Sequence, residues 1–219
     1  MPTFLKKELE DAGYIVKEPI DQVLVVEDFA SSEELKHVFN IINNLTQDDW
    51  SIEYTQNLAR FCLQKFGRDD VENLVKEGKF EITQGWQDKN YLMYGDPVIT
   101  SWLEKVVSIV SNADPSLEQA GMITLQRMQE GVELKAHTDQ HTDPSIKYAT
   151  ILYLNDDYVA GELFFSNKGL ELKPKPGTLI FFPGTDEFNH GVRHVGKGPI
   201  RYVVVGFIKV TDFYKENKY

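Results

Sequence analysis

This sequence has only one cysteine, no long apolar run and no excess of basic residues. Cys62 is the single cysteine among 219 residues, so no disulfide can form within the chain, and a reducing, cytoplasmic setting is expected. No apolar run approaches the roughly 20 residues that cross a bilayer, and the Lys/Glu-rich start differs from a secretory signal. The sequence therefore indicates no membrane partner.

The net charge of −11 lies entirely in the first part of the chain. Residues 1–120 hold 11 Lys/Arg against 22 Asp/Glu, whereas residues 121–219 hold 12 of each sign. A general nucleic-acid binder needs a basic surface, so nucleic acid is not an expected partner. The acidity is compatible with a neutral or cationic substrate, and the need for solubility also explains it.

Two amphipathic helices are predicted in the first part of the chain. Ser31-x-x-Glu34 has the form of a capping box and precedes apolar residues at helical spacing. Asp96-Pro97 starts the second helix, with an aspartate cap and a proline in the first turn. Between them the pattern is irregular, and Asn57–Phe66 is interpreted as a further short helix.

After Gly121 the apolar period changes to that of strands. Eight short β-rich stretches are separated by turn residues: Met122–Met128, Leu134–Thr138, Ala149–Asn155, Glu162–Ser166, Leu170–Lys173, Thr178–Pro183, Gly191–Val195 and Arg201–Val210. Such a series predicts a mainly β fold, a cupin-like double-sheet jelly roll with the N-terminal helices buttressing one sheet. The length favours a single domain over residues 1–219.

Within these strands, His137-Thr138-Asp139 and the distant His190 form a candidate metal site. Two imidazoles and one carboxylate occupy one face of an iron(II) ion and leave the other face open, as non-haem iron oxygenases require. Residues two apart on a strand point to the same side, which suits His137 and Asp139. The repeat His141-Thr142-Asp143 offers a second pair, and His194 is a rival to His190.

Four ordered patterns resemble the iron(II)/2-oxoglutarate-dependent dioxygenases, in particular their prolyl 4-hydroxylase-like branch. They are Gly131-(five residues)-His137-x-Asp139, Tyr153-Leu154-Asn155, Gly161-Glu162-Leu163-Phe164 with the later Pro176–Phe182, and His190-Gly191-Val192-x-x-Val195-x-x-Gly198 ending in Arg201-Tyr202. The resemblance covers roughly the second half of the chain and implies a double-stranded β-helix. Its spacing selects His137, Asp139 and His190 as metal ligands and catalytic residues, and it implies Fe(II), 2-oxoglutarate, O2 and ascorbate as a reductant.

Arg201 is the candidate binding residue for the co-substrate. It shares one strand face with Val203, Val205 and Phe207, where a buried guanidinium is costly unless an anion neutralises it. A carboxylate of 2-oxoglutarate would do so with bidentate geometry. The resemblance implies Tyr153 as a second contact, although a core aromatic explains it equally well. Many relatives carry tyrosine where this chain has Met128, which leaves the substrate class open.

The polar-aromatic stretch 83–95 is predicted to be a lid over the substrate, with Trp86, Tyr91 and Tyr94 as its contact residues. The alternative is that these aromatics pack the sheet to the helices. Residues 1–120 would thus supply helical support and a possible lid, and residues 121–210 the jelly-roll catalytic core.

The expected activity is hydroxylation of an unactivated C–H bond, with a prolyl residue in a peptide or protein as the leading substrate by analogy. A free amino acid or another small metabolite is the alternative substrate. A non-catalytic jelly-roll binding module is the alternative function.

Overall fold

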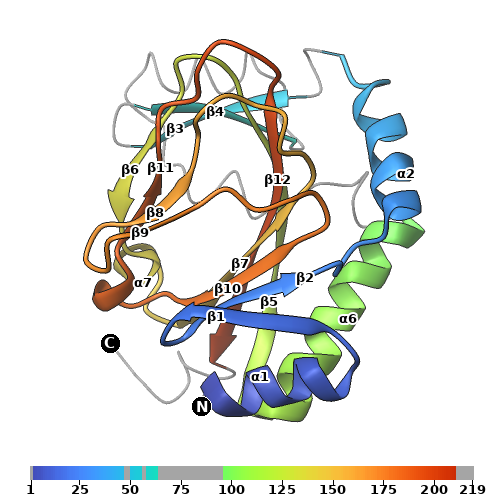
Figure 1. Ribbon diagram of the computed structural model, residues 1–219, viewed down its shortest axis with the longest axis vertical. Coiled ribbons are helices and arrows are strands. Elements are labelled where there is room, and N and C mark those ends of the chain that lie inside the picture. The colour runs from blue at the N-terminus through green and yellow to red at the C-terminus, as the bar shows by residue number, and fades with distance from the viewer. Residues whose placement is uncertain (1, 47–49, 56–57, 64–95, 211–219) are drawn as a thin grey trace.

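The computed structural model describes residues 2–46, 50–55, 58–63 and 96–210, and two antiparallel sheets form its centre (Figure 1). The larger sheet has eight strands in the order β1-β2-β10-β7-β12-β5-β4-β3, and the smaller has four in the order β6-β11-β8-β9. The strands are β1 Ile15–Ile20, β2 Val23–Glu27, β3 Trp50–Thr55, β4 Leu58–Leu63, β5 Leu117–Met128, β6 Leu134–His137, β7 Ile146–Tyr153, β8 Leu163–Phe165, β9 Leu170–Leu172, β10 Leu179–Pro183, β11 His190–Val192 and β12 Arg201–Val210. The predicted mainly β, two-sheet core is confirmed.

Each of the eight β-rich stretches predicted after residue 121 overlaps a strand, and β12 has the predicted bounds. The interpretation of Asn57–Phe66 as a helix is wrong, because Leu58–Leu63 is strand β4, which pairs with both β3 and β5. Helix α1, Pro2–Asp11, carries no strong sequence signal and was not expected. In each case the neighbouring element decides the conformation and local propensity does not.

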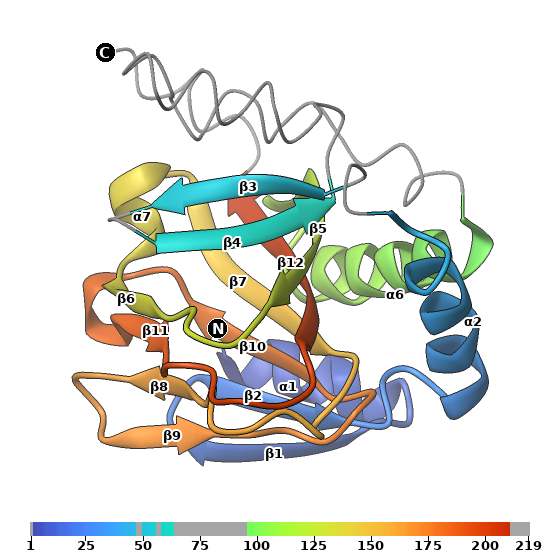
Figure 2. The same ribbon diagram turned by 90° about the horizontal axis from the view of Figure 1, so that it is seen from above.

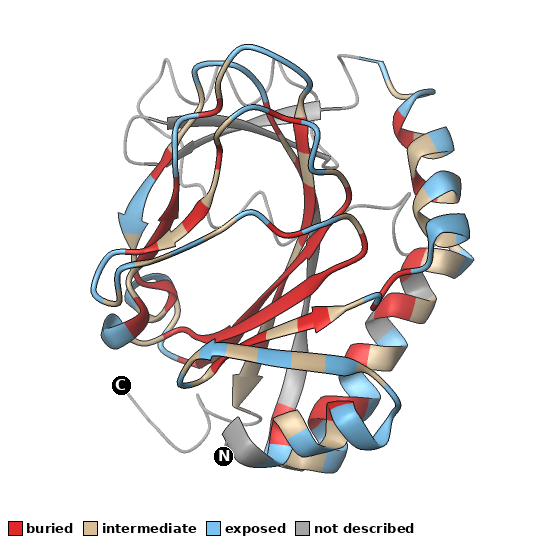
Figure 3. Ribbon diagram, viewed as in Figure 1, coloured by how far each residue is buried: buried red, intermediate tan, exposed pale blue. Residues whose placement is uncertain are grey.

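The central strands β7, β10 and β12 are buried on both faces, so their side chains alternate between two cores. Leu152, Val204 and Ile208 belong to the core under the helices, whereas Tyr153 and Val203 belong to the core that the smaller sheet closes. Since successive side chains of a strand point to opposite faces, the two cores interleave along β7 and β12. Figure 3 shows the resulting buried centre and the more exposed edge strand β1.

Three helices cover the face of the larger sheet that is turned away from the smaller one (Figure 2). They are α1, α2 Ser32–Ile42 and α6 Pro97–Ala113. The predicted capping box of α2 is confirmed: the Ser31 side chain accepts from the Glu34 N–H, and the Glu34 carboxylate accepts from the Ser31 N–H. None of the described helices is both long enough and apolar enough to cross a membrane.

Asp96 joins α2 to the start of α6. Its Oδ1 accepts hydrogen bonds from the N–H groups of Val98 and Ile99, and its Oδ2 lies 2.6 Å from Nε2 of His37 on α2. Burial alone would raise the pKa of Asp96, but the hydrogen bonds from His37, Ile99 and Val98 hold that pKa below 3.8. The ionised carboxylate is therefore the form that stabilises the fold.

Replacing Asp96 with alanine is expected to lower the free energy of unfolding by about 1–2 kcal/mol at neutral pH, the cost of a lost helix cap. A carboxyl whose pKa is lowered in the folded state stabilises that state above its unfolded pKa. Its contribution is lost as the pH falls through the lower folded pKa. Urea unfolding should therefore show a difference between Asp96→Ala and wild type that shrinks when the pH is brought to about 3. The control His37→Ala removes one partner and keeps the cap, so its loss should be smaller; a difference that stays constant on acidification would contradict this role.

Candidate active site

Two histidines face each other across the smaller sheet. His137 ends β6 and His190 starts β11, and these two residues are direct partners in the antiparallel register. Their ring centroids lie 4.5 Å apart. Strand pairing thus brings together two histidines that lie 53 positions apart in the sequence, as the predicted metal site requires.

Asp139 brings a carboxylate to the same point, although not from a strand. The expectation that His137 and Asp139 share one strand face is wrong, because Asp139 is the first residue of the short helix α7, Asp139–Thr142. Its Oδ1 lies 3.7 Å from Nε2 of His137, and its Oδ2 lies 3.8 Å from Nε2 of His190. One ligand atom from each of the three residues lies within 4.8 Å of the other two.

The outer nitrogens of both rings are fixed by backbone carbonyls. Nδ1 of His137 lies 3.0 Å from the oxygen of Lys135, and Nδ1 of His190 lies 3.0 Å from the oxygen of Phe188. Because a carbonyl oxygen only accepts, each Nδ1 carries a proton, and each Nε2, on the side of Asp139, is the ring nitrogen that can bind a metal. This second-shell arrangement orients imidazoles that bind a metal.

These three side chains fit a first-row transition metal. Separations of 3.7 and 3.8 Å are too long for hydrogen bonds but suit two atoms bonded to one ion at about 2.0–2.2 Å each. Two neutral imidazoles and one carboxylate form the donor set typical of non-haem iron(II) sites with open positions.

Aromatic side chains pack against the ring of His190. Its ring packs against Phe182 at 4.5 Å, and Phe182 packs against Phe165 at 5.1 Å. Gly191 lets β11 approach β6 closely, since a Cβ there would lie 2.4 Å from the Leu134 carbonyl oxygen. The glycine of the His-Gly-Val pattern is therefore a packing requirement beside the histidine.

The second His-x-Asp pair lies away from this cluster. His141 is on the exposed side of α7, where its Nε2 lies 2.8 Å from Asp186. Asp143 accepts hydrogen bonds from Ser145 and pairs with Lys209 at 2.6 Å. His194 is exposed. The structure thus brings His137, Asp139 and His190 together. His141 and Asp143 form ion pairs elsewhere, with Asp186 and Lys209.

Arg201 is buried in the interior, with 1% of its surface exposed. Its Nη2 donates to the hydroxyl of Tyr153 at 3.0 Å, and its Nη1 lies 3.4 Å from the sulfur of Met128. None of the acidic residues in the described part of the chain forms an ion pair with it. Among the described residues, a phenol and a thioether hydrogen-bond this buried guanidinium but do not neutralise its charge, so the site favours an anion.

The interior that contains Arg201 also reaches the histidines. Tyr153 belongs to the same apolar cluster as Phe165 and Phe182, two rings that contact His190. One end of this interior therefore offers three metal ligands, and the other end offers a cation with a hydroxyl.

The sequence model of the 2OG-Fe(II) oxygenase superfamily matches residues 123–209, a stretch that includes the three ligands, Tyr153 and Arg201. Over these residues the chain is similar to that superfamily. Human prolyl 3-hydroxylase 2 is 35% identical over 74 residues, which are 32% of this chain and 10% of the human protein. The chain thus spans about a tenth of the length of the curated relatives that it matches.

Solved structures agree with this fold. A prolyl hydroxylase from Trichoplax adhaerens, in complex with a hypoxia inducible factor peptide fragment, has a TM-score of 0.66 at 13% identity and covers 100% of this chain and 93% of its own. A Pseudomonas putida prolyl-4-hydroxylase has a TM-score of 0.62 at 14% identity, with coverage of 94% and 98%. The double-stranded β-helix that the sequence patterns implied is confirmed.

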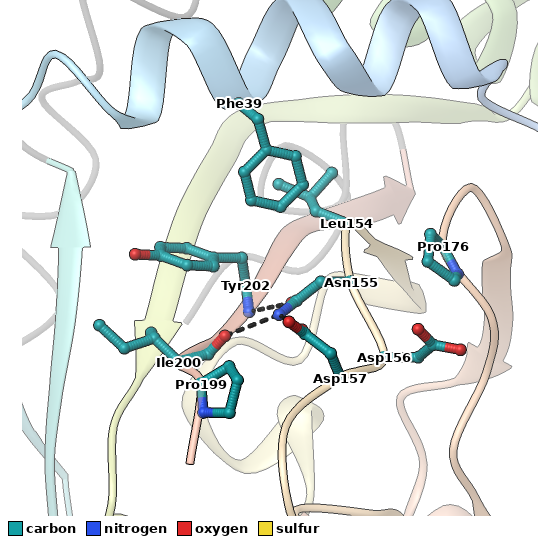
Figure 4. A pocket seen from close by; sticks show the side chains of 9 residues that line it. All are labelled: Phe39, Leu154, Asn155, Asp156, Asp157, Pro176, Pro199, Ile200 and Tyr202. Carbon is teal, nitrogen blue, oxygen red and sulfur yellow. Dashed lines mark hydrogen bonds between the residues drawn. The ribbon is translucent and has the colours of Figure 1, made fainter.

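Asn155, the last residue of the Tyr-Leu-Asn pattern, fixes the backbone on either side of Arg201. Its Nδ2 donates to the carbonyl oxygen of Ile200 at 2.7 Å, and its Oδ1 accepts from the N–H of Tyr202 at 2.8 Å (Figure 4). Arg201 points inwards, whereas Tyr202 points outwards and packs edge-on against Phe39 of α2.

The pocket in Figure 4 is separate from the metal ligands. It is an open surface hollow of about 460 Å³ between α2 and the ends of β7 and β12, lined by residues that include Phe39, Pro176, Pro199 and Tyr202. None of the three metal ligands or Arg201 lines it.

Two further points concern the predicted site residues. The lid residues Trp86, Tyr91 and Tyr94 lie outside the described residues, so their role stays a prediction. Tyr158, which the sequence interpretation missed, lies buried with its ring centre 5.8 Å from the Arg201 guanidinium carbon. The signal for it is weak, because a tyrosine after an Asn-Asp-Asp turn gives no indication of burial beside a cation.

Proposed function

We propose that this protein is an Fe(II)- and 2-oxoglutarate-dependent dioxygenase that hydroxylates an unactivated C–H bond of a prolyl residue in a peptide or protein. The observation that carries the proposal is the cluster of His137, Asp139 and His190, with both Nδ1 atoms held by carbonyls and both Nε2 atoms turned to one carboxylate. The single cysteine supports placing the reaction in a reducing, cytoplasmic compartment.

The three ligands would hold iron(II) on one face, which leaves the opposite positions for the co-substrate and oxygen. When bound, iron(II) supplies the oxygen chemistry: O2, 2-oxoglutarate and the substrate C–H bond become succinate, CO2 and an alcohol. One oxygen atom enters succinate and the other enters the product, so no further reductant is consumed in a coupled turnover.

The other residues of the site would bind the co-substrate and keep water away from the metal ligands. Arg201 and Tyr153 would hold the distal carboxylate of 2-oxoglutarate through charge-assisted hydrogen bonds. Phe165 and Phe182 keep water from one side of the His190 ring. Because Asn155 grips the chain on both sides of Arg201, the guanidinium is held in place before the co-substrate arrives.

The prolyl substrate is supported by the likeness to prolyl 3-hydroxylase 2 over 74 residues and by the fold shared with prolyl hydroxylases. Proline-containing peptides with neutral or basic flanks are the first substrates to test, since residues 1–120 carry the whole net charge of −11. A free amino acid remains the alternative substrate within the same reaction.

Turnover tests the proposal directly. The protein loaded with Fe(II) should convert 2-oxoglutarate to succinate in air with ascorbate present, and a matching peptide should gain the mass of one oxygen atom. Asp139→Asn, which keeps the side-chain volume, is the control and should form no succinate. A protein that binds iron but forms no succinate with any peptide or amino acid would be a binding module and would contradict the proposal.

A further inference from the structure

Arg201 is flanked by two buried tyrosines. Its guanidinium carbon lies 5.0 Å from the ring centre of Tyr153 and 5.8 Å from that of Tyr158. Tyr153 hydrogen-bonds Arg201, whereas Tyr158 reaches the same place from the segment between β7 and β8 and is 1% exposed. A third polar side chain thus lies beside the proposed anion site.

Two polar atoms at this point have no hydrogen-bond partner within the described part of the chain. They are the hydroxyl of Tyr158 and Nε of Arg201, and both are fully buried. Buried polar groups are nearly always paired, because leaving one unpaired costs about 1–3 kcal/mol. Two such atoms from neighbouring side chains are explained by one ligand that accepts hydrogen bonds from both.

The two side chains also converge on the same glycine. A Cβ on Gly161 would lie 3.3 Å from the ring of Tyr158 and 3.4 Å from Cδ of Arg201, the carbon bonded to the unpaired Nε. Gly161 has φ +71°, a conformation that suits glycine, and the missing Cβ lets the side chains of Tyr158 and Arg201 pack close to each other.

The segment that carries Tyr158 is held firmly. Lys173 donates to the Tyr158 carbonyl oxygen at 2.6 Å, and its amine lies 4.8 Å from the centre of the ring. The N–H of Gly196 donates to the carbonyl oxygen of the next residue, Val159, at 2.8 Å. The ring is therefore positioned before any ligand binds.

The protonation state suits a donor. Burial raises the pKa of Tyr158 well above its usual range, and Arg201 offsets this only in part. The neutral phenol keeps its proton at physiological pH and can give it to an anion in a hydrogen bond.

We propose that Tyr158 donates a hydrogen bond to the distal carboxylate of the 2-oxo acid and, with Arg201 and Tyr153, selects a dicarboxylate over a monocarboxylate. This inference rests on the proposed function and adds a specificity-determining residue to it. A site with three donors aimed at one carboxylate discriminates strongly against a ligand that lacks it, because the donors are then left unpaired.

The test compares two ligands on Tyr158→Phe, with Mn(II) in place of iron so that no turnover occurs. The dissociation constant of 2-oxoglutarate, measured by calorimetry, should rise about tenfold or more, the loss expected for one hydrogen bond to a charged group. That of 2-oxovalerate, which has the same carbon chain without the distal carboxylate, should stay unchanged, and so should Mn(II) affinity. The ligand-free variant should melt at the same temperature as wild type or higher, since an unpaired buried hydroxyl has been removed.

Tyr148→Phe is the matched control, because Tyr148 is a buried tyrosine on β7 that belongs to the core under the helices. It should leave both dissociation constants unchanged. Unchanged 2-oxoglutarate affinity in Tyr158→Phe would overturn the inference alone, as would equal weakening of both ligands together with a lower melting temperature. Failure of wild type to bind 2-oxoglutarate at all would overturn the proposed function and this inference with it.

Discussion

Replacing Asp139 with alanine is expected to abolish both tight metal binding and succinate formation, whereas Asp143→Ala should leave both near wild type. Asp139 is 7% exposed in its side chain, and its two oxygens face the Nε2 atoms of His137 and His190. Removing this carboxylate takes away one of three ligands, so the loss of metal affinity should exceed the roughly 10–100-fold cost of losing an outer-shell partner. Asp143 instead ties Ser145 and Lys209 together at the start of β7.

Equilibrium titration with Mn(II) measures metal binding without turnover, and succinate formation with Fe(II) measures activity. Circular dichroism would check that each variant is folded. Asp143→Ala is a close control because it removes the same chemical group from the neighbouring His-x-Asp pair. If Asp143→Ala lost metal binding while Asp139→Ala bound metal and turned over normally, the metal site would belong to the second pair, and our assignment would be wrong.

The choice between the two pairs shows what sequence patterns could predict here. His137-Thr138-Asp139 and His141-Thr142-Asp143 are identical in residue type and spacing, so local chemistry does not separate them. Distance from Gly131 and Tyr153 in the family pattern favoured the first pair. The physical reason is the strand register, which places His137 opposite His190, whereas His141 falls on the outer side of α7.

Where sequence reasoning failed, contacts distant in the chain decide the outcome. A strand period was extended through Asp139, but the chain turns into α7 there, and the backbone N–H of Gln140 bonds the carbonyl oxygen of Gly184. The pattern of Asn57–Phe66 predicts a helix, yet Leu58–Leu63 within it is strand β4, between β3 and β5 in the larger sheet. Tyr158 was missed because its burial depends on Arg201 and Gly161, which no local pattern connects to it.

Periodicity and capping predicted the rest of the architecture well. The caps of α2 and α6 are local sequence signals, Ser31/Glu34 and Asp96-Pro97. Strands such as β7, β10 and β12 are β-rich and largely apolar, because they are buried on both faces. Inward-facing positions on β12 were correct for the same reason, and they place Arg201 in the core with Val203. The sequence does not identify a protein group that neutralises Arg201, because the expected partner is a ligand carboxylate.

Replacing Arg201 with methionine is expected to weaken 2-oxoglutarate binding about 100-fold or more while metal affinity stays unchanged. The guanidinium is the buried cation of the site, and hydrogen bonds between charged groups contribute about 1.5–3 kcal/mol each. Methionine keeps much of the side-chain volume and removes the charge. Because the charge has no carboxylate partner among the described residues, its removal should also raise the melting temperature of the ligand-free protein.

Ligand-induced stabilisation gives the decisive measurement. Excess 2-oxoglutarate with Mn(II) should raise the melting temperature of wild type by mass action and should have little further effect on Arg201→Met beyond that of Mn(II) alone. Arg201→Lys keeps the charge but loses the bidentate geometry, so it should fall between the two. Lys197→Ala is the matched control: Lys197 is an exposed cation just before β12 and should not affect binding. Normal 2-oxoglutarate binding by Arg201→Met, with loss of binding in Lys197→Ala, would move the anion site from the interior to the surface, since Lys197 would then be the residue that holds the carboxylate.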